Sequence, residues 1–288
     1  MIQHAIHTGN RKLMSTNKLN AALAAEVLSF LNVPAAVPTL PVLEALLAAY
    51  YRRVPWESVF RIVRRAENPT PRWPDLFWRD AISHGGGGTC FESNYAFFAL
   101  LQTLGYDGYL TINNMGESIG CHTAIVVVLD GQKWLVDVGL PLYALLPISN
   151  QGVMHRSSPF LHYAVRPNGR STYQIERWPH PKRTAFTLVD EPVDDTTYRA
   201  ATANDYGEFG LFLEFVIINK VVDGEPWRFN MAERPWALNR FDWGQKMDTL
   251  LEGDAAVAVA EHFGLETAVV QRAFALTQHN YPNQELTG

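Results

Sequence analysis

Cys90 is the residue of this chain whose surroundings most favour chemistry. Four glycines, Gly85 to Gly88, precede Thr89, and Thr89 and Glu92 have the spacing of a capping box. We therefore expect Thr89 to be the N-cap of a helix whose first residue is Cys90. Unpaired N–H groups and the macrodipole at a helix N-terminus favour the thiolate, which is the nucleophilic form of cysteine. A small buried apolar residue is the alternative interpretation of Cys90.

A second chemical pair, His122 and Asp137, lies on a predicted hairpin. Two runs rich in β-branched residues, 122–129 and 132–138, flank an Asp-Gly dipeptide at 130–131. This dipeptide predicts a two-residue type I′ turn, which also fixes the register of the two strands. In that register residue 137 lies opposite residue 124, so His122 and Asp137 project from one face as diagonal neighbours.

Together these three residues predict a Cys-His-Asp nucleophile system. An acid that orients a histidine, close to a thiol at a helix N-terminus, is the arrangement that activates a cysteine. The alternative is that His122 is an ordinary strand histidine and Asp137 an acid at a strand end.

Cys121 and Ser118 support two competing hypotheses. Cys90, Cys121, His122 and Asp137 are all possible zinc ligands, but residues 121 and 122 point to opposite faces of a strand, and we expect neither a metal site nor a Cys90–Cys121 disulfide. Residues 116–120, GESIG, match the nucleophile elbow G-x-S-x-G. That motif needs a helix after the serine, whereas a strand is predicted here, so we expect Ser118 in a loop.

Composition limits the class of protein. The chain has 288 residues, 47% of them hydrophobic, with a formal net charge of -5, so it can bury a sizeable core and is not expected to bind nucleic acid. Apolar runs are short and broken by charges, and residues 1–20 lack a signal-peptide core, so we expect no membrane span. Two cysteines do not make a disulfide scaffold and favour a reducing cytoplasm.

The predicted elements change type along the chain. Asn17 is expected to cap a first helix that ends at residues 32–34, and a second helix is expected after Thr39 and Pro41. A short helix is expected near residues 76–82, and the Cys90 helix should end at Gly105. Beyond Gly105 the pattern predicts strands, beginning with residues 109–113. The first third is therefore predicted to be helical, and the following part to be β-sheet.

Several segments of the chain resemble the arylamine N-acetyltransferases. Residues 87–94, GGTCFESN, are similar to the R-G-G-x-C-x-E-x-N nucleophile motif of that family, and residues 54–58, VPWES, to its I-P-F-E-N segment. The histidine that opens a strand, followed by LDG at 129–131 and LVDVG at 135–139, is also similar, as is FTL at 186–188. The resemblance extends from about Leu19 to the end of the chain.

The resemblance implies an α+β fold in three parts. Residues 1–105 would form a helical domain that carries Cys90, residues 106–205 an antiparallel β-barrel that carries His122 and Asp137, and residues 206–288 an α/β lid. The same cysteine-protease and transglutaminase-like core, with the same order of triad residues, occurs in related thiol enzymes.

The resemblance also implies the reaction. Acetyl-CoA or another acyl-CoA would donate its acyl group to Cys90, and an aromatic amine or hydrazine would then accept it, without a metal. Thr89, Gly139, Leu140 and Pro141 would contact substrate or coenzyme. Lys182, Arg183 and Lys220 are either contacts for coenzyme phosphates or solvated surface charges.

The chain departs from the family at the residues that would contact substrates. Gly86 stands where the family has arginine, and Thr89 replaces an aromatic residue. Leu140 and Pro141 replace a Phe-Gly pair next to the acceptor pocket, which would reshape that pocket. A hydrolase or transglutaminase-like enzyme, an amide synthase that closes a tethered acyl chain on an amine, and an inactive relative therefore stay as alternative functions.

Overall fold

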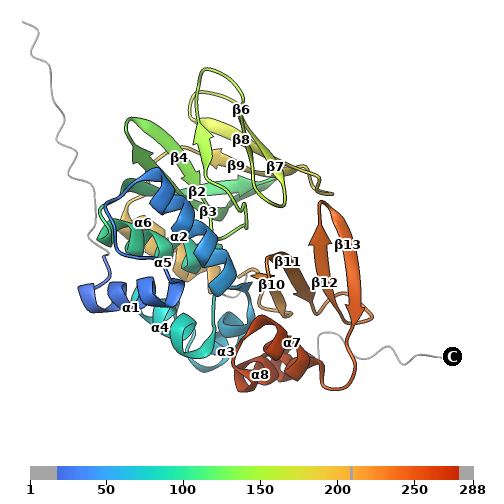
Figure 1. Cartoon of the computed structure of the whole chain (residues 1–288). Helices are drawn as coiled ribbons and strands as arrows, with labels where there is room; N and C mark the ends of the chain where they lie inside the picture. The colour runs from blue at the N-terminus through green and yellow to red at the C-terminus, as the bar shows by residue number, and fades with distance from the viewer. Residues whose placement is uncertain (1–17, 208–209, 279–288) are drawn as a thin grey trace, which may run out of the picture.

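The computed structural model describes residues 18–207 and 210–278. Five helices occupy most of the first third of the chain, as predicted, and they are listed here in order: α1 (Ala21–Leu31), α2 (Leu40–Arg53), α3 (Val59–Glu67), α4 (Pro74–His84) and α5 (Cys90–Thr103). In Figure 1 they lie below the larger sheet, with α2 and α5 directly beneath it.

The ends of these helices follow from local residues, with one correction. Asn32 and Gly105 follow α1 and α5 with positive φ, which suits a helix C-terminus. The expected cap at Asn17 is wrong, because α1 begins at Ala21 and the Asn20 side chain accepts from the Leu23 N–H. Asn17 itself lies outside the described residues.

The larger sheet is antiparallel and nearly closed. Its eight strands are, in chain order, β2 (Asp107–Met115), β3 (Ser118–Leu129), β4 (Gln132–Val136), β5 (Leu146–Ile148), β6 (Met154–Ser157), β7 (His162–Pro167), β8 (Thr172–Trp178) and β9 (Thr184–Val189). Their spatial order is β5-β4-β3-β2-β9-β8-β7-β6, and β5 packs near β6 and β7. The sheet thus curls around a core of its own, to which Ala124, Ile175 and Phe186 belong.

The β3–β4 hairpin has the predicted register. Leu129 pairs with Gln132 and Ile125 with Val136, and both Asp130 and Gly131 have positive φ, as a type I′ turn requires. The strand predicted for residues 132–138 ends earlier, at Val136, so Asp137 lies just beyond the ladder.

The C-terminal part is built on a smaller antiparallel sheet. Its strands are β1 (Trp56–Glu57), β10 (Ile217–Val222), β11 (Glu225–Asn230), β12 (Ala237–Asp242) and β13 (Gln245–Leu250), and they pair in that order. Helices α7 (Ala255–Phe263) and α8 (Thr267–Thr277) share a core with this sheet and with α3. The remaining helix, α6 (Asp195–Asp205), packs against α5.

Residues 56–67 therefore join the two ends of the chain. Although they lie within the predicted helical domain, β1 pairs with β10 and α3 packs on α8. The three-part division of the chain stays a prediction, and the α+β class, with helices first and an antiparallel barrel next, is confirmed.

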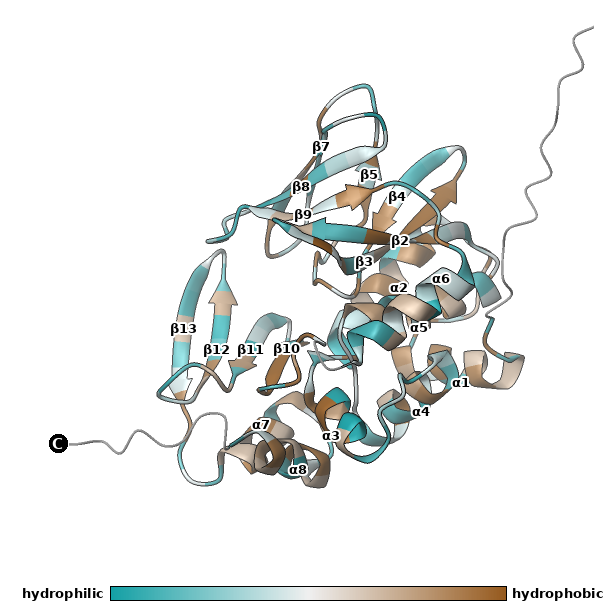
Figure 2. Ribbon diagram, turned by 180° about the vertical axis from the view of Figure 1, so that it is seen from behind, coloured by the Kyte–Doolittle hydropathy of each residue, from teal (hydrophilic) through white to brown (hydrophobic). Residues whose placement is uncertain are grey.

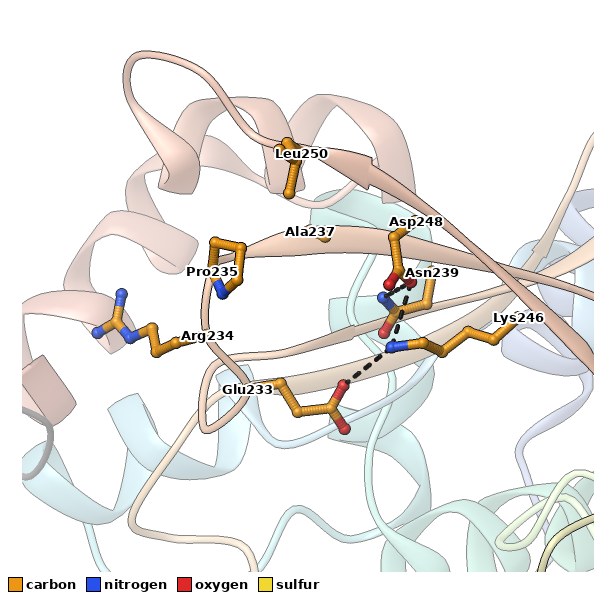
Figure 3. Close-up of a pocket in the computed structure, with 8 residues that line it drawn as sticks. All are labelled: Glu233, Arg234, Pro235, Ala237, Asn239, Lys246, Asp248 and Leu250. Carbon is orange, nitrogen blue, oxygen red and sulfur yellow. Dashed lines mark hydrogen bonds and ion pairs between the residues drawn. The ribbon is translucent and has the colours of Figure 1, made fainter. Parts of the chain in front are cut away.

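A cavity of about 280 Å³ lies on the smaller sheet between β12, β13 and the 233–235 segment (Figure 3). Lys246 pairs there with Glu233 at 3.7 Å and with Asp248 at 3.2 Å, and the Asn239 amide donates to Asp248 at 2.8 Å. The charges at its mouth are thus matched locally. None of the residues that line it is a predicted site residue, and in Figure 2 β13 is mostly hydrophilic.

Among the described residues, no helix combines the length and the apolar character that a membrane crossing requires.

Candidate active site

Cys90 is the first residue of α5, as predicted, and it lies beside β3. Thr89 is the N-cap, and the Cys90 side chain is 7% exposed. The Sγ atom lies 3.8 Å from the Cys121 carbonyl oxygen, and the Thr123 hydroxyl donates to the Cys90 carbonyl at 2.9 Å. The helix start is therefore attached to the strand that carries His122, the residue between these two contacts.

The predicted capping box does not form. Thr89 makes no side-chain bond to the helix, and its Oγ1 instead accepts from Arg61 Nη1 at 3.0 Å. Glu92 turns away from Thr89 and accepts from Arg72, at 3.2 Å from Nε and 2.9 Å from Nη2. A buried arginine offers the Glu92 carboxylate two charge-assisted bonds, which are stronger than a single bond to a backbone N–H.

Arg72 links this buried carboxylate to the glycine loop. Its Nη2 donates to the Gly87 carbonyl at 2.6 Å, while Glu57 accepts from the Gly87 N–H at 3.0 Å. Burial raises the pKa of Glu57. Burial acts in the same direction on Glu92, but Arg72 and the Tyr206 hydroxyl outweigh it and lower the pKa of Glu92. The network thus fixes the loop before Cys90 through both the carbonyl and the N–H of Gly87.

His122 and Asp137 meet as the register predicted. His122 Nε2 lies 2.7 Å from Asp137 Oδ2, and both side chains are buried. The imidazole ring also packs edge-on against Phe186 of β9, with 4.6 Å between ring centroids. Both contacts restrict the ring, so its other nitrogen faces away from the acid.

Asp137 ends its strand by bonding to the turn that follows. Its Oδ1 accepts from the N–H groups of Gly139 at 2.8 Å and Leu140 at 3.0 Å, an arrangement that competes with continued strand pairing. A Cβ at Gly139 would lie 2.5 Å from Cys90 Cα, so glycine lets this turn approach the helix start. The turn therefore brings the 137–140 segment against Cys90.

Asn94 of α5 bonds both to β3 and to the segment around Asp137, although the sequence analysis gave it no role. Its Nδ2 donates to the Thr123 carbonyl at 2.7 Å and to Asp137 Oδ1 at 3.1 Å, and its Oδ1 accepts from the Val138 N–H at 3.0 Å. Asn94 lies one turn after Cys90 on the same helix, and this i, i+4 spacing is the signal that could have identified it.

Two tyrosines also hold the segments that carry Asp137 and Cys90. The Tyr51 hydroxyl donates to the Asp137 carbonyl and accepts from the Leu142 N–H at 3.2 Å. From α6, the Tyr198 hydroxyl donates to the Phe91 carbonyl at 2.9 Å and lies 3.1 Å from Thr123 Oγ1. No local sequence pattern predicts such contacts, because the partners are distant along the chain.

The electrostatics of the pair favour a protonated imidazole. Burial lowers the pKa of His122, but the charge of Asp137, the hydrogen bond to it and the interaction with Cys90 outweigh burial and raise that pKa to about 10. The carboxylate of Asp137 and the sulfur of Cys90 thus both favour the imidazolium form of His122.

The other residues predicted for the site lie outside the group formed by Cys90, His122 and Asp137. Leu140 and Pro141 are half-buried in the turn after Asp137. Lys220 Nζ donates to the Phe263 carbonyl, and the Arg183 guanidinium lies over Trp178. Ser118 was expected in a loop, but it is the exposed first residue of β3, whose hairpin pairing with β2 extends to this end.

Both cysteines are free thiols. In the described parts of the chain, no three His, Cys, Asp or Glu side chains are grouped so that they could hold a metal ion.

The fold is shared with solved structures. The arylamine N-acetyltransferase from Mycobacterium abscessus superposes with a TM-score of 0.75 at 19% identity, covering 93% of this chain and 99% of that one. The Mycobacterium marinum arylamine N-acetyltransferase, solved in complex with CoA, also gives a TM-score of 0.75 at 19% identity, covering 89% and 98%. These similarities define the class of fold.

A sequence comparison points to one further relative. Proansamycin X synthase of Amycolatopsis mediterranei (strain S699) is 33% identical over 108 residues. The match covers 35% of this chain and 42% of that protein, so this chain spans less than half the length of the curated relative.

A family model for N-acetyltransferases matches residues 39–206, which is more than half of the chain and includes α5, β3 and the 137–140 turn. The chain therefore belongs to the N-acetyltransferase family, and the resemblance noted in the sequence is confirmed.

Proposed function

We propose that this protein is an acyl-CoA-dependent N-acyltransferase that carries the acyl group on Cys90. The observation that supports this most is the 2.7 Å contact between His122 and Asp137, made beside a thiol at the start of α5. Family membership supports the same reaction class. The roles of the three residues are part of this proposal.

In the first half-reaction the Cys90 thiolate attacks the thioester carbonyl of the acyl donor. Asp137 holds the His122 ring and stabilises its positive charge. The carbon–sulfur bond to the coenzyme breaks, and the leaving thiolate takes the proton from His122. One thioester replaces another, so the exchange is nearly isoenergetic.

In the second half-reaction an amine attacks the acyl group on Cys90. Neutral His122 takes the amine proton, the new carbon–nitrogen bond forms, and the Cys90 thiolate leaves. The hydrogen bond and the Coulombic interaction with Cys90 raise the pKa of His122 in the free protein, and acylation removes both. The pKa of His122 should therefore fall in the acyl-enzyme, which prepares the ring to act as a base.

Thr89, Gly139, Leu140 and Pro141 are proposed to border the substrates. Gly139 and Leu140 contact Asp137 through their N–H groups, and Thr89 precedes the nucleophile. An aromatic amine or a hydrazine is the proposed acceptor. The two free thiols favour a reducing compartment, and we propose the cytoplasm.

An amide-forming synthase is the second candidate, and two observations favour it. The curated relative is a synthase, and residues 140–141 are Leu-Pro where the resemblance expects Phe-Gly. In such a reaction the amine that attacks the acyl group on Cys90 would belong to the same substrate molecule.

Product analysis separates the two candidates. The protein is mixed with acetyl-CoA and an aromatic amine or hydrazine, or with an acyl thioester that carries its own amine, and products are followed by liquid chromatography and mass spectrometry. Acetylated amine supports the acyltransferase, and a cyclic amide from the second substrate alone supports the synthase. Equal product from Cys90→Ala would contradict both.

A further inference from the structure

The tip of the β12–β13 hairpin carries a tryptophan where the backbone disfavours one. In the hairpins at 130–131, 223–224 and 243–244 the chain turns through two residues that both have positive φ. Aspartate, which tolerates this conformation, precedes glycine in the first two, whereas Trp243 takes that place in the third, with φ 41°. A bulky residue in this conformation is strained, and such strain points to a role for its side chain.

The Trp243 ring contacts the barrel. It lies on His162, the first residue of β7, with 5.0 Å between ring centroids, and His162 in turn packs against Trp178 of β8 at 5.7 Å. The neighbouring Gly244 lies against Pro179, since a Cβ at Gly244 would be 2.9 Å from the Pro179 Cβ. The tip of a hairpin from the smaller sheet is thus docked on the end of the larger one (Figures 1 and 2).

Cys90 lies where the same two sheets come together at the helices. On one side its Sγ is 3.8 Å from the Cys121 carbonyl of β3, in the larger sheet. On the other side Gly88, two residues before Cys90, pairs with Trp56 of β1, and β1 pairs with β10 in the smaller sheet. The two sheets therefore meet near Cys90 and again at the Trp243 tip, so that the chain forms a closed ring between these two places.

The docked tip is a contact that can open. The Trp243 side chain is 46% exposed, and it meets His162 as an aromatic pair. A pair of this kind favours a closed state over an open one by a factor of about 2 to 10. A ligand that needs the open state binds more weakly in proportion to the fraction of open molecules. This cost falls on ligands too large to pass the closed ring, because small ones reach Cys90 in either state.

We propose that Trp243 is a specificity-determining residue, which latches the β12–β13 hairpin onto the barrel and thereby slows the approach of large molecules to Cys90. The inference rests on the proposed function and adds a selection of substrates by size. Short thioesters and small amines pass the closed ring, whereas an acyl donor as long as acetyl-CoA needs the hairpin to open. Closure behind the donor then keeps water away from the acyl group.

A direct contact with coenzyme is the other interpretation of these aromatic rings. The Arg183 guanidinium lies over Trp178, so a phosphate could bind close to the docked tip. The two interpretations predict opposite effects of removing the Trp243 ring. A latch slows acetyl-CoA, so its loss speeds the reaction, whereas loss of a coenzyme contact slows it.

The first arm of the experiment compares acyl donors of different size. Acylation of Cys90 is followed by intact mass with acetyl-CoA and with the acetyl thioester of N-acetylcysteamine, which is short and has no phosphate. Trp243→Asn removes the ring and gives the turn a residue that suits positive φ, so the hairpin stays intact while the latch is lost. We expect acetyl-CoA to react about 2- to 10-fold faster with this variant. The rate with the short thioester should change by less than about 2-fold.

Matched variants test the latch itself. Trp243→Phe keeps an aromatic ring at the tip and should retain part of the wild-type behaviour. His162→Ala removes the other partner, so adding Trp243→Asn to it should have no further effect if both residues act through one contact. Lys246→Ala, on the same hairpin but paired with Glu233 and Asp248, should behave as wild type.

Three results of this arm would overturn the proposal. A slower reaction of Trp243→Asn with acetyl-CoA would mean that the aromatic rings bind coenzyme directly. An equal change with both donors would mean that Trp243 supports the fold around Cys90 and does not select by size. Unchanged rates with both donors would mean that the docked tip does not limit access.

The second arm does not depend on acyl transfer. In a Cys121→Ser background, Cys90 is alkylated with iodoacetamide, which is small, and with fluorescein maleimide, which is bulky and rigid. Trp243→Asn should speed the fluorescein reagent by about 2- to 10-fold and leave iodoacetamide within about 2-fold. This gain supports the latch even if Cys90 takes no acyl group from acetyl-CoA, a result that would end the proposed function alone. Equal rates of the fluorescein reagent with and without Trp243→Asn would contradict the latch.

Discussion

Two clusters of buried charge flank Cys90, and they differ in whether a proton can move within them. On one side His122 faces Asp137 and the sulfur, and its raised pKa of about 10 is a property of an ionisable base held near a nucleophile. On the other side Arg72 lies between Glu92, which it bonds at 2.9 Å, and Glu57, at 3.9 Å, and against the effect of burial it holds the pKa of Glu92 below its ordinary value. The first cluster is suited to proton transfer, and the second to holding the glycine loop and the helix start in place.

The two clusters should therefore respond differently to substitution. Changes in the His122 cluster should affect rates more than folding, and changes in the Arg72 cluster should affect folding first. The cavity on β12 and β13, with its locally matched charges, should affect neither.

Replacing Asp137 with asparagine should have the largest effect on rate. The amide keeps the shape but cannot stabilise an imidazolium, so acylation of Cys90 should slow by about 10³- to 10⁴-fold. Stopped-flow or quenched labelling with acetyl-CoA measures this rate, and circular dichroism checks the fold. A rate within tenfold of wild type would remove Asp137 from the mechanism.

Replacing Arg72 with methionine should have the largest effect on folding. It leaves the Glu92 and Glu57 carboxylates buried without their cation, which should cost about 3–5 kcal/mol of unfolding free energy. Denaturant unfolding measures the loss. The double variant Arg72→Met, Glu92→Met removes both charges of the main pair and should recover part of the lost unfolding free energy. An Arg72→Met protein as stable as wild type would show that the network does not support the fold.

The raised pKa of His122 predicts how stability changes with pH. The folded value is about 10 and the ordinary value 6.5, so the folded protein binds the proton more tightly than the unfolded chain. The resulting stabilisation should be fully present below about pH 6.5 and lost as pH rises through about 10, and it should be on the order of a few kcal/mol. Denaturant unfolding of wild type and Asp137→Asn from pH 6 to 10.5 tests this, because the difference in their unfolding free energies should become smaller as pH rises. A difference that does not change with pH would contradict the raised pKa of His122.

Replacing Lys246 with alanine should have the smallest effect. Its two partners are as exposed as Lys246 itself, and exposed ion pairs contribute about 0–1 kcal/mol. Labelling of Cys90 should change by less than about 2-fold. A large loss of activity would mean that the cavity on the smaller sheet takes part in the reaction.

The sequence predicted the His122 cluster better than the Arg72 cluster, for a physical reason. A two-residue turn and strand alternation are local, and together they placed residues 122 and 137 on one face. Arg72 reaches Glu92 across 20 residues, and no local pattern encodes that contact. The capping box failed for the same reason, since a distant arginine competed for its glutamate.

Polar residues close together in sequence also limited the prediction of helix ends. Asn17 and Asn20 are both good N-caps, and only the packing of α1 decides between them. Asn94 ends the 87–94 motif and lies one turn after Cys90, but its bonding partners could not be predicted, because they depend on how α5, β3 and the 137–140 turn are placed relative to one another. The register of one hairpin could be derived from the sequence, whereas the assembly of the barrel could not.

The most direct test of the account is to mix the protein with acetyl-CoA and determine by intact mass and peptide mapping where the acyl group is bound. One acetyl group is expected on Cys90, formed quickly at neutral pH, absent from Cys90→Ala and formed much more slowly in Asp137→Asn. An unlabelled protein, or an acetyl group on Cys121 instead, would contradict it.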